Sequence, residues 1–395
     1  MLDSAMEVFD REVGGDRAGD PHGNERLHFR GVVGTLLAAA FEPVTRSQRT
    51  IDDLSLYPSV QRVSGVERVA RSTLSDALAK FDPERLRPMI RAIQKQIPHL
   101  DRLDSDTAAV ARRVIALDGS WFNLAGEVAH ALHCNRGNTS QKQARIRWNL
   151  QLDVDQFLPE DCDVSGNGDG SEAAAFMRRL QSDCIYVVDR NFVHFGFLNA
   201  VLKSESSFVL RLKKGVLFQV DQTHALSEKD SAHHVLRDET GHLSGPTSRG
   251  NADARSCSAK PPAQTLRRVT VWDEKNQCKL VLLTDLLDVP AFVIGAIYRQ
   301  RWMIELFFRW LKMLAGFRHL ISQSPRGITT QFYVAVLMSL LIQLHNGRRR
   351  LSKYALMWVG WLAHDRATPE MMARAMARHE RERLLDRARR AKKKI

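Results

Sequence analysis

The stretch Cys184-Ile-Tyr-Val-Val-Asp189 decides the fold, because five consecutive hydrophobic residues end at a carboxylate. A strand that is hydrophobic at every position has to be buried on both faces, as in a parallel sheet covered by helices. A second run of this kind, Val114-Ile-Ala-Leu-Asp118, lies earlier in the chain. Together the two runs predict an α/β fold in which both strands belong to one sheet.

The segments around these two runs predict the rest of the sheet. Residues 114–117, residues 127–133 and the alternating segment 146–152 are typical of an antiparallel meander. A Gly/Asp-rich loop at 166–170 precedes a predicted helix at 172–180, and a helix near 194–202 precedes a strand at 207–213. Residues 216–285 break this alternation with Gly, Ser, Asp and Pro around short strand-like runs, which indicates a β-rich insertion.

Asp118 and Asp189 each follow a predicted strand directly, so the strand ends would hold both side chains at one edge of the sheet. Each residue by itself has another interpretation. Asp118 precedes Gly119 and could be a turn residue, whereas Asp189 could form an ion pair with Arg190. The order of the elements favours a shared site, because a helix that carries one glutamate follows the insertion.

That helix is the run Tyr298-Arg-Gln-Arg301-Trp-Met-Ile-Glu305-Leu-Phe-Phe-Arg-Trp-Leu-Lys312. On one continuous helix its polar residues fall within an arc of about 60°, and mostly apolar side chains cover the remainder; they are Tyr298, Arg301, Glu305 and Lys312. A solvated surface helix, the alternative, would have a wider polar face. If the helix packs on the sheet, Glu305 meets the two aspartates, and three carboxylates favour Mg²⁺ or Mn²⁺ over Zn²⁺.

The composition points to a polyanionic partner. Lys and Arg exceed Asp and Glu by 58 − 45 = 13 in a chain of 395 residues, and basic residues gather at 348–350 and 381–394. A basic surface without a partner is the alternative. The apolar segment Val334–Leu344 is too short to span a bilayer and predicts a core helix. Five cysteines without a C-x-x-C pair are typical of reduced thiols in the cytoplasm, and a zinc site is not expected.

The N-terminal region is predicted to be helical. Residues 1–25 are expected to be a loose, flexible leader, and helices are predicted at 47–54, 63–70 and 72–81, the last with Ser72 as its N-cap. The short break before Ser72 resembles a helix-turn-helix, whereas simple packing of a helical hairpin is the alternative. From such a motif four residues could reach DNA: Arg71, Thr73, Ser75 and Lys80.

The ungapped spacing of Tyr298, Arg301, Glu305 and Lys312 resembles the Y-R-E-K signature of DDE transposases of bacterial insertion sequences, which include hairpin-forming cut-and-paste enzymes. Residues 283–287 and 298–302 are also similar to family sequence. The resemblance implies a ribonuclease-H-like mixed five-stranded sheet flanked by helices, with a β-rich insertion and an α-helical N-terminal domain. It further implies that the catalytic residues Asp118, Asp189 and Glu305 hold two Mg²⁺ ions, which Mn²⁺ can replace.

The same resemblance implies roles for other residues. Tyr298, Arg301 and Lys312, together with Arg190, would bind DNA phosphates, and Trp272 in the insertion is the candidate for stacking on a flipped base. An ordinary strand aromatic is the alternative for Trp272. The family commonly has Asp-Arg-Gly before an aromatic residue, whereas this chain has Asn191 in place of the glycine. Asparagine is the next best residue for a left-handed turn.

These features predict a cytoplasmic, nucleoid-associated DNA transposase that binds terminal inverted repeats, cleaves the ends and joins the 3′-hydroxyls to target DNA. Its expected partners are double-stranded DNA and a second copy in a homodimer, with no membrane. A ribonuclease-H-like nuclease or resolvase and a non-catalytic DNA-binding relative are the alternatives. The expected domains are a helical DNA-binding region at 1–105, a catalytic core at 106–215 and 286–346 around the insertion at 216–285, and a basic helical region at 347–395.

Overall fold

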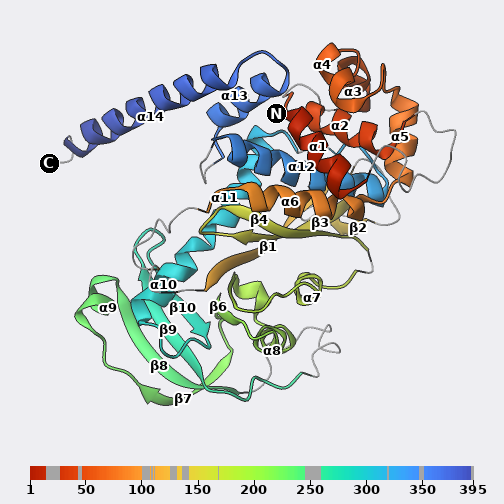
Figure 1. The fold of residues 1–395 in the computed structure, drawn as a ribbon. Coiled ribbons are helices and arrows are strands. Elements are labelled where there is room, and N and C mark those ends of the chain that lie inside the picture. Colours follow the sequence, from red (N-terminus) through yellow and green to blue (C-terminus); the bar gives the residue numbers. More distant parts are fainter. Residues whose placement is uncertain are drawn as a thin grey trace.

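The computed structural model describes residues 1–14, 27–42, 47–99, 107, 110, 112–124, 131–135, 142–167, 169–244, 259–317, 320–346 and 351–392. A mixed sheet runs through the molecule, with the N-terminal helices gathered at one end and the strands that follow residue 216 at the other (Figure 1). The C-terminal helix α14 (Pro369–Lys392) extends away from this body. The basic run 348–350 lies outside the described residues.

One continuous sheet of ten strands is present in the described part of the chain. Its order is β2-β3-β1-β5-β6-β10-β9-β8-β7, and β4 pairs with β3. The strands are β1 Arg113–Asn123, β2 Leu132–Asn135, β3 Lys142–Asp153, β4 Leu158–Ser165, β5 Cys184–Val188, β6 Ser207–Arg211, β7 Leu217–Thr223, β8 Val235–Ser244, β9 Leu266–Asp273 and β10 Cys278–Thr284.

The strand directions confirm the mixed α/β class. β1, β5 and β6 are parallel neighbours, and β3 is antiparallel to β1. The described sheet nevertheless has ten strands where five were expected, because β10 pairs antiparallel with β6 and thereby joins the later strands to the earlier ones. This pairing satisfies backbone groups that β6 would otherwise leave unpaired at a sheet edge. β4 was not predicted, since its acidic residues obscure the apolar alternation.

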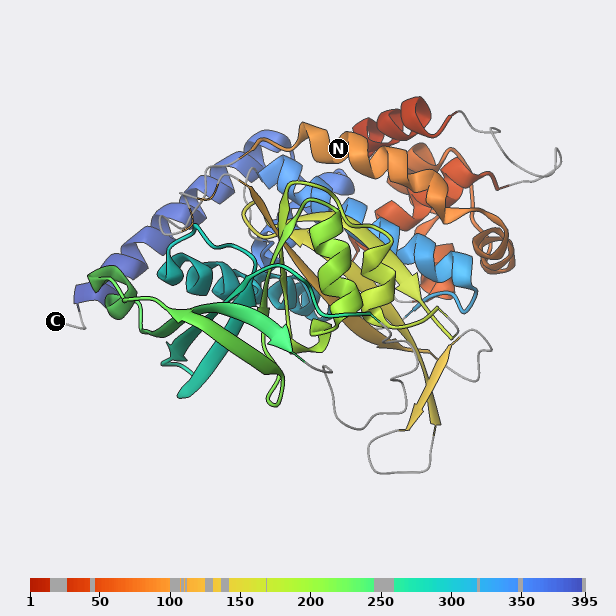
Figure 2. The same cartoon turned by 90° about the horizontal axis from the view of Figure 1, so that it is seen from below.

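Helices cover both faces of the sheet. One face, which includes Ile115 and Tyr186, packs on α7 (Glu172–Met177) and α8 (Phe195–Lys203). The opposite face, which includes Ala116 and Val187, packs on α10 (Ala291–Gln300), α11 (Trp302–Arg309) and α12 (Pro325–Asn346). In Figure 2, α7 and α8 lie in front of the sheet and α12 lies behind it. The apolar runs of β1 and β5 are therefore buried on both sides, as expected of parallel strands.

α12 is the central helix of the larger core. It is long and apolar enough to cross a membrane, but 89% of its most apolar segment is buried inside the protein. This burial confirms the core helix predicted for Val334–Leu344. The N-terminal helices pack around it, including α2 (Phe29–Ala40), α5 (Arg71–Lys80) and α6 (Arg87–Gln96).

The N-terminus differs from the expected loose leader. Residues Leu2–Glu12 form the helix α1, in which Leu2, Met6 and Phe9 are buried. These positions recur at helical spacing and bury one face against the core. The prediction of a flexible leader is therefore wrong for this helix, whereas residues 15–26 lie outside the described residues.

Two predicted N-terminal helices are displaced in the structure. α3 (Gln48–Leu54) agrees with the helix predicted at 47–54 and is capped by Ser47, but α4 (Pro58–Ser64) replaces the helix predicted at 63–70. Pro58 starts α4, and Gly65 ends it with a φ of 74° that suits glycine. α5 begins at Arg71, so Ser72 is not its N-cap. Three of its four candidate DNA contacts are exposed: Arg71, Ser75 and Lys80.

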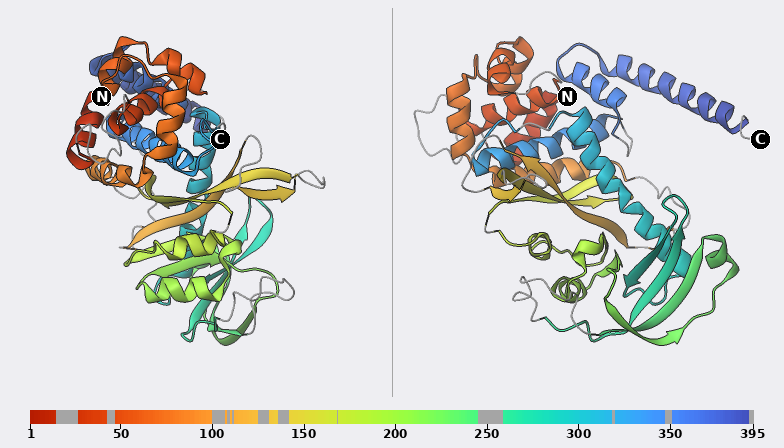
Figure 3. Two further views of the ribbon diagram at one scale, coloured as in Figure 1. Left: turned by 90° about the vertical axis from the view of Figure 1, so that its right-hand side faces the viewer. Right: turned by 180° about the vertical axis from the view of Figure 1, so that it is seen from behind.

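The Y-R-E-K segment is not the single regular helix that was predicted. α10 ends at Gln300, Arg301 is a turn residue, α11 follows, and residues Trp310–Leu314 form a π-helical turn. The Arg301 N–H bonds to the Tyr298 carbonyl at 3.1 Å, which tightens the chain at this point. A π turn inserts an extra residue, so spacing by 3.6 residues no longer holds as far as Lys312. Figure 3 shows α10 and α11 running along the sheet from the strands β7 to β10 toward the N-terminal helices.

Candidate active site

The register of two parallel strands places Asp118 and Asp189 side by side. β1 and β5 pair Ala116 with Val187, so two further steps bring Asp118 level with Asp189, on strands about 4.8 Å apart. β1 does not end before Asp118 as predicted, because its pairing with β3 continues to Asn123. Asp118 is therefore a strand residue, not a turn residue, and it lies beside the point where β5 stops.

Asp189 is fixed by the turn that follows β5. Its Oδ1 accepts a hydrogen bond from the Asn191 N–H at 2.6 Å and caps the short 3₁₀ helix η2 (Arg190–Phe192). Asn191 does not have the positive φ of a left-handed turn, so a glycine is not required here. Arg190 is exposed and makes no ion pair within the part of the chain that the structure describes. The alternative of an Asp189–Arg190 pair is thus not found.

Glu172 is an acidic residue of this region that sequence reasoning missed. It lies in the first turn of α7, which Ser171 caps. A Cβ atom on Gly119 would lie 2.5 Å from Glu172 Oε1, so Glu172 occupies space that only a glycine leaves open. Its Oε1 is buried and has no hydrogen-bond partner among the described residues. Gly119 leaves the space beside Asp118, but a glycine in the sequence does not indicate that Glu172 is the residue that fills this space.

These carboxylates repel one another in a partly buried place. Burial raises the pKa of Asp118 to about 7; the charge of Glu172 adds to this, Arg301 opposes it, and Asp189 adds again. Burial also raises the pKa of Glu172, which the charge of Arg147 opposes and that of Asp189 reinforces. A cation at this point would relieve the repulsion.

Glu305 reaches the region from α11 but is held by an arginine. Its Oε1 accepts a hydrogen bond from Arg301 Nη2 at 2.6 Å, and 18% of the Arg301 side chain and 32% of the Glu305 side chain are exposed. Burial opposes the charge of Arg301, but Glu305 and Tyr298 together raise its pKa, and Asp118 adds to the effect. Burial raises the pKa of Tyr298, against the effect of Arg301. The structure therefore brings Tyr298, Arg301 and Glu305 close to Asp118.

The residues fit a divalent ion in part. Within the described ranges, no three His, Cys, Asp or Glu side chains are arranged so that they could hold a metal together. The Glu305 carboxylate is bonded to Arg301 instead. The level pair of aspartates and the partnerless Glu172 Oε1 nevertheless supply oxygen donors, which Mg²⁺ and Mn²⁺ prefer. Asp118 and Asp189 would hold the ion, and Glu305 would join them after leaving Arg301.

The spacing predicted that Lys312 shares one polar stripe with Glu305, but the structure places its side chain against the far part of β1. Its Nζ donates a hydrogen bond to the Trp121 carbonyl at 2.8 Å and lies 4.4 Å from the centre of the Phe122 ring. The π turn accounts for this position, because it rotates Lys312 out of line with Glu305. The structure therefore brings Lys312 to strand β1 but not to the Arg301–Glu305 pair.

A cavity of about 580 Å³ opens beside Arg301, between the strands β9 and β10 and the turn from α10 to α11. Trp272, Tyr298 and Arg301 all line it. Trp302 lines it as well, with 41% of the residue exposed and Lys275 and Arg309 near its ring, at 5.7 Å and 5.4 Å from the centre. The half-buried Trp272 thus borders a space that it shares with two of the candidate phosphate-binding residues.

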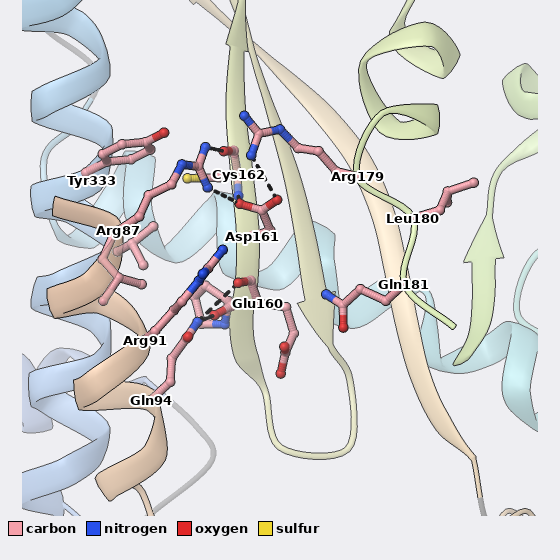
Figure 4. A pocket seen from close by; sticks show the side chains of 13 residues that line it. Arg87, Arg91, Gln94, Glu160, Asp161, Cys162, Arg179, Leu180, Gln181 and Tyr333 are labelled. Atoms are coloured by element: carbon pink, nitrogen blue, oxygen red, sulfur yellow. Dashed lines mark hydrogen bonds and ion pairs between the residues drawn. The ribbon is translucent and has the colours of Figure 1, made fainter. Parts of the chain in front are cut away.

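A second cavity, of about 490 Å³, lies between α6, β4 and the loop after α7. Figure 4 shows Arg87 from α6 and Arg179 from the loop approaching the same carboxylate, that of Asp161. Arg87 also donates to the Cys162 carbonyl at 3.0 Å. The carboxylate of Asp161 thus neutralises both arginines, and the cavity lies where the N-terminal helices meet the sheet.

The comparison with protein families matches residues 110–341 to the family described as "Transposase DDE domain". The matched range includes Asp118, Asp189 and Glu305, and it extends from the beginning of β1 into α12.

Two curated relatives are similar to this chain. "Putative transposase y4zB" from Sinorhizobium fredii is 24% identical over 62% of this chain and 64% of its own length. "Probable transposase for insertion sequence element IS5377" from Geobacillus stearothermophilus is 24% identical over 56% of this chain and 55% of its own length. The chain thus spans less than two thirds of either relative.

Among solved structures, the chain is similar to one described as "Cryo-EM structure of piggyBac transposase synaptic complex with hairpin DNA". The identity is 10%, the coverage is 95% of this chain and 76% of the other, and the TM-score is 0.43. This likeness is too weak to carry an argument.

Proposed function

Because the chain belongs to the family of the transposase DDE domain, we propose that it is a DNA transposase that binds the terminal inverted repeats of an insertion sequence, cleaves the ends and joins the 3′-hydroxyls to target DNA. The observation that carries this proposal is the pair Asp118 and Asp189, set level by the strand register, with Glu305 linked to the pair through Arg301. Two level aspartates with a glutamate nearby suit metal-dependent phosphoryl transfer.

We take five strands of the larger sheet as a ribonuclease-H-like core. In the order β4-β3-β1-β5-β6, the last three strands are parallel and β3 is antiparallel to both of its neighbours. On this proposal, residues 106–215 and 286–346 form the catalytic domain and residues 216–285 are an insertion. The strand pairing of β6 with β10 supports it, since the insertion leaves and rejoins the core at these strands.

Asp118, Asp189 and Glu305 are proposed to hold two Mg²⁺ ions. When bound, these ions would lower the pKa of the attacking water or 3′-hydroxyl and stabilise the leaving oxygen. The protein contributes positioning: the strands fix the two aspartates, and α11 brings the glutamate. Mn²⁺ would serve as well, because it accepts the same oxygen donors.

Four residues are proposed to bind the DNA phosphates. Arg301 is bonded to Glu305, and Tyr298 lies beside Arg301. Arg190 is exposed directly after Asp189, and Lys312 bonds to the Trp121 carbonyl on the far part of β1. Since Arg301 is bound to Glu305 in the structure, a phosphate that attracts Arg301 would also release Glu305. Binding of the DNA end and completion of the ion site would then be coupled.

Trp272 is proposed to stack on a base that leaves the duplex. Its support is the cavity of about 580 Å³ that it lines with Tyr298 and Arg301, because a flipped base needs a pocket and an aromatic surface. End DNA with 2-aminopurine at the terminal positions should show a fluorescence change with the wild type and a reduced one with Trp272→Ala. Trp361→Ala, at a tryptophan that is 38% exposed on α13 (Lys353–Ala363), is the matched control.

Two copies of the chain are proposed to hold two transposon ends in a homodimer, in the cytoplasm at the nucleoid. The projecting helix α14 supports an intermolecular role, because Leu384 and Leu385 remain 55% and 59% exposed on it. Pairing of copies and contact with DNA are both compatible with this basic helix.

The deciding experiment uses linear DNA that carries the ends of the element encoding this chain. In Mg²⁺ the wild type should cut at these ends, and Asp118→Ala, Asp189→Ala and Glu305→Ala should bind the DNA without cutting it. Asp221→Ala, at a half-exposed aspartate on β7, is the control for loss of a carboxylate. Wild-type cleavage by any one of the three variants would remove that residue from the proposed site.

The same experiment separates the alternative functions. Cleavage without preference for the ends would favour a nuclease or resolvase, and binding without cleavage would favour a non-catalytic relative. A salt series tests whether the protein binds DNA through its phosphates. With six phosphate contacts, raising the salt from 50 to 200 mM should weaken binding by about 10³-fold. A flat response would contradict binding through the DNA backbone.

A further inference from the structure

We propose that Glu172 is a fourth acidic residue of the active site, which positions the water shell of the divalent ion held by Asp118 and Asp189. This inference rests on the proposed function, because it assumes that the two aspartates bind the ion. Glu172 belongs to α7, on the sheet face opposite to the one that α10 and α11 cover. It therefore approaches the aspartates from the side that the helix carrying Glu305 does not reach.

The backbone around Asp118 leaves an opening for this side chain. β5 ends at Val188, level with Leu117, so the edge of β1 that faced β5 has no parallel partner from Asp118 onward. Gly119 follows, and its missing side chain leaves room for the Glu172 carboxylate. Glu172 lies close enough to both aspartates for its charge to act on each of them. Glu172 therefore lies beside the position on β1 from which Asp118 projects.

The unused oxygen of Glu172 indicates what the carboxylate binds. Oε1 is shielded from solvent and has no hydrogen-bond partner of standard geometry among the described residues, and the nearby Gly119 N–H donates to Asp118 Oδ1 at 3.0 Å. Leaving a buried carboxylate oxygen without a partner is costly. Mg²⁺ keeps several of its waters when carboxylates bind it, and these waters are strong hydrogen-bond donors. A water of the ion would give Oε1 its missing partner and would hold the ion in register with Asp118.

A purely structural role explains less. A glutamate in the first turn of a helix favours the helix through the macrodipole, but that effect operates at the surface and needs no burial beneath a neighbouring strand. Arg147, which also approaches Gly119, neutralises part of the Glu172 charge but forms no ion pair with it within the described residues. Instead, the Arg147 Nε donates to Asn149 Oδ1 at 2.9 Å.

The test measures ion binding directly, with Mn²⁺ titrated into the full chain and detected by electron paramagnetic resonance. Loss of an outer-shell partner typically weakens metal affinity by about tenfold or more, so Glu172→Gln should raise the Mn²⁺ dissociation constant by about tenfold. The Mg²⁺ concentration for half-maximal cleavage should rise by the same factor, and saturating Mg²⁺ should restore most of the rate. DNA binding without metal should not change, which a merely structural role would not predict.

Two further variants keep the test decisive. Gly119→Ala should displace the Glu172 carboxylate and weaken Mn²⁺ binding similarly, and combining it with Glu172→Gln should add little. Glu160→Gln, at a carboxylate on β4 that is 17% exposed and paired with Arg113, should leave Mn²⁺ binding unchanged. A Glu172→Gln protein that binds Mn²⁺ as the wild type does would overturn this inference alone. Wild-type Mn²⁺ binding by Asp118→Ala would instead overturn the proposed function.

Discussion

The three acidic residues of the proposed site come from two parts of the molecule that hold them in different ways. Asp118 and Asp189 lie on neighbouring parallel strands, and backbone hydrogen bonds fix their relative position. Glu305 lies on α11 after a break in the helix, and a side-chain bond to Arg301 fixes its carboxylate. The strand pair is therefore set once the sheet forms, whereas the position of Glu305 depends on what Arg301 binds.

This difference indicates where regulation of the reaction can arise. A backbone register does not respond to a ligand, but an ion pair between exposed or half-buried side chains can be exchanged for another partner. A DNA phosphate is a strong competitor for an arginine, because it offers charge-assisted and bidentate hydrogen bonds. We therefore expect the strand pair to act in the free protein and Glu305 to act only in the DNA complex.

The largest expected effect separates ion binding from cleavage. Asp189→Asn and Glu305→Gln should each reduce cleavage by about 10³-fold or more, since a lost ligand removes several kcal/mol of transition-state stabilisation. In the free protein, however, Asp189→Asn should abolish Mn²⁺ binding, whereas Glu305→Gln should leave it nearly unchanged. Calorimetric titration with Mn²⁺ measures this difference. Equal loss of Mn²⁺ binding in both variants would show that Glu305 already acts without DNA.

Arg301→Gln should separate the two parts further. Without Arg301, Glu305 is free to join the aspartates, and the free protein should bind Mn²⁺ about threefold more tightly, the worth of a partly exposed ion pair. The affinity for end DNA should fall by about tenfold, because a charged hydrogen bond to phosphate is lost. Arg309→Gln, at an exposed arginine over Trp302 on the same helix, should change neither value. Unchanged Mn²⁺ affinity in Arg301→Gln would contradict the expectation that Arg301 keeps Glu305 from joining the aspartates.

The sheet part of the site should also have a pH signature in the metal-free protein. Burial raises the pKa of Asp118 to about 7; Glu172 and Asp189 add to this and Arg301 opposes it. The raised pKa means that the folded state binds this proton more tightly than the unfolded state, so stability is lost as pH rises from about 4 to 7. Asp118→Asn should therefore be more stable at pH 8, by roughly 1 kcal/mol or more.

Thermal unfolding of both proteins between pH 4 and pH 8 checks this expectation. The difference in free energy of unfolding should be small near pH 4, grow up to pH 7 and remain level above it. Mg²⁺ at pH 8 should stabilise the wild type and have little effect on Asp118→Asn. A constant difference across the pH range would show that Asp118 ionises normally.

The sequence predicts those features of the site that depend on residues close together in the chain, and it does not predict those that depend on packing. The run before Asp189 predicted a buried parallel strand, because burial on both faces requires apolar residues at every position. The run before Asp118 was predicted as a strand of an antiparallel meander, and the structure pairs it with β3 in the antiparallel sense and with β5 in the parallel sense. The spacing around Glu305 predicted one regular helix, and this prediction is wrong. Periodicity assumes one uniform turn, and the break at Arg301 and the π turn before Ala315 both depend on packing that spacing does not encode.

Other features had no local signal. Glu172 becomes a neighbour of Asp118 only through the fold, by way of the space over Gly119. The pairing of β10 with β6 joins the insertion to the core sheet, and no pattern within either strand specifies that partner. The helix α1 carries its apolar residues among charged ones, so the sequence resembles a leader although Met6 and Phe9 are buried.

The smallest expected effects distinguish the two outer phosphate candidates, one from each part of the site. Lys312 is held by the Trp121 carbonyl and the Phe122 ring, whereas Arg190 is exposed after the strand pair. A residue that must first break a contact within the protein contributes less net binding free energy when it binds a phosphate. Arg190→Ala should therefore weaken binding of end DNA by about threefold or more, and Lys312→Ala should weaken it by less. Fluorescence anisotropy at 50 mM and 200 mM salt measures both losses, and the reverse order would place the phosphate track along α11 instead of along the end of β5.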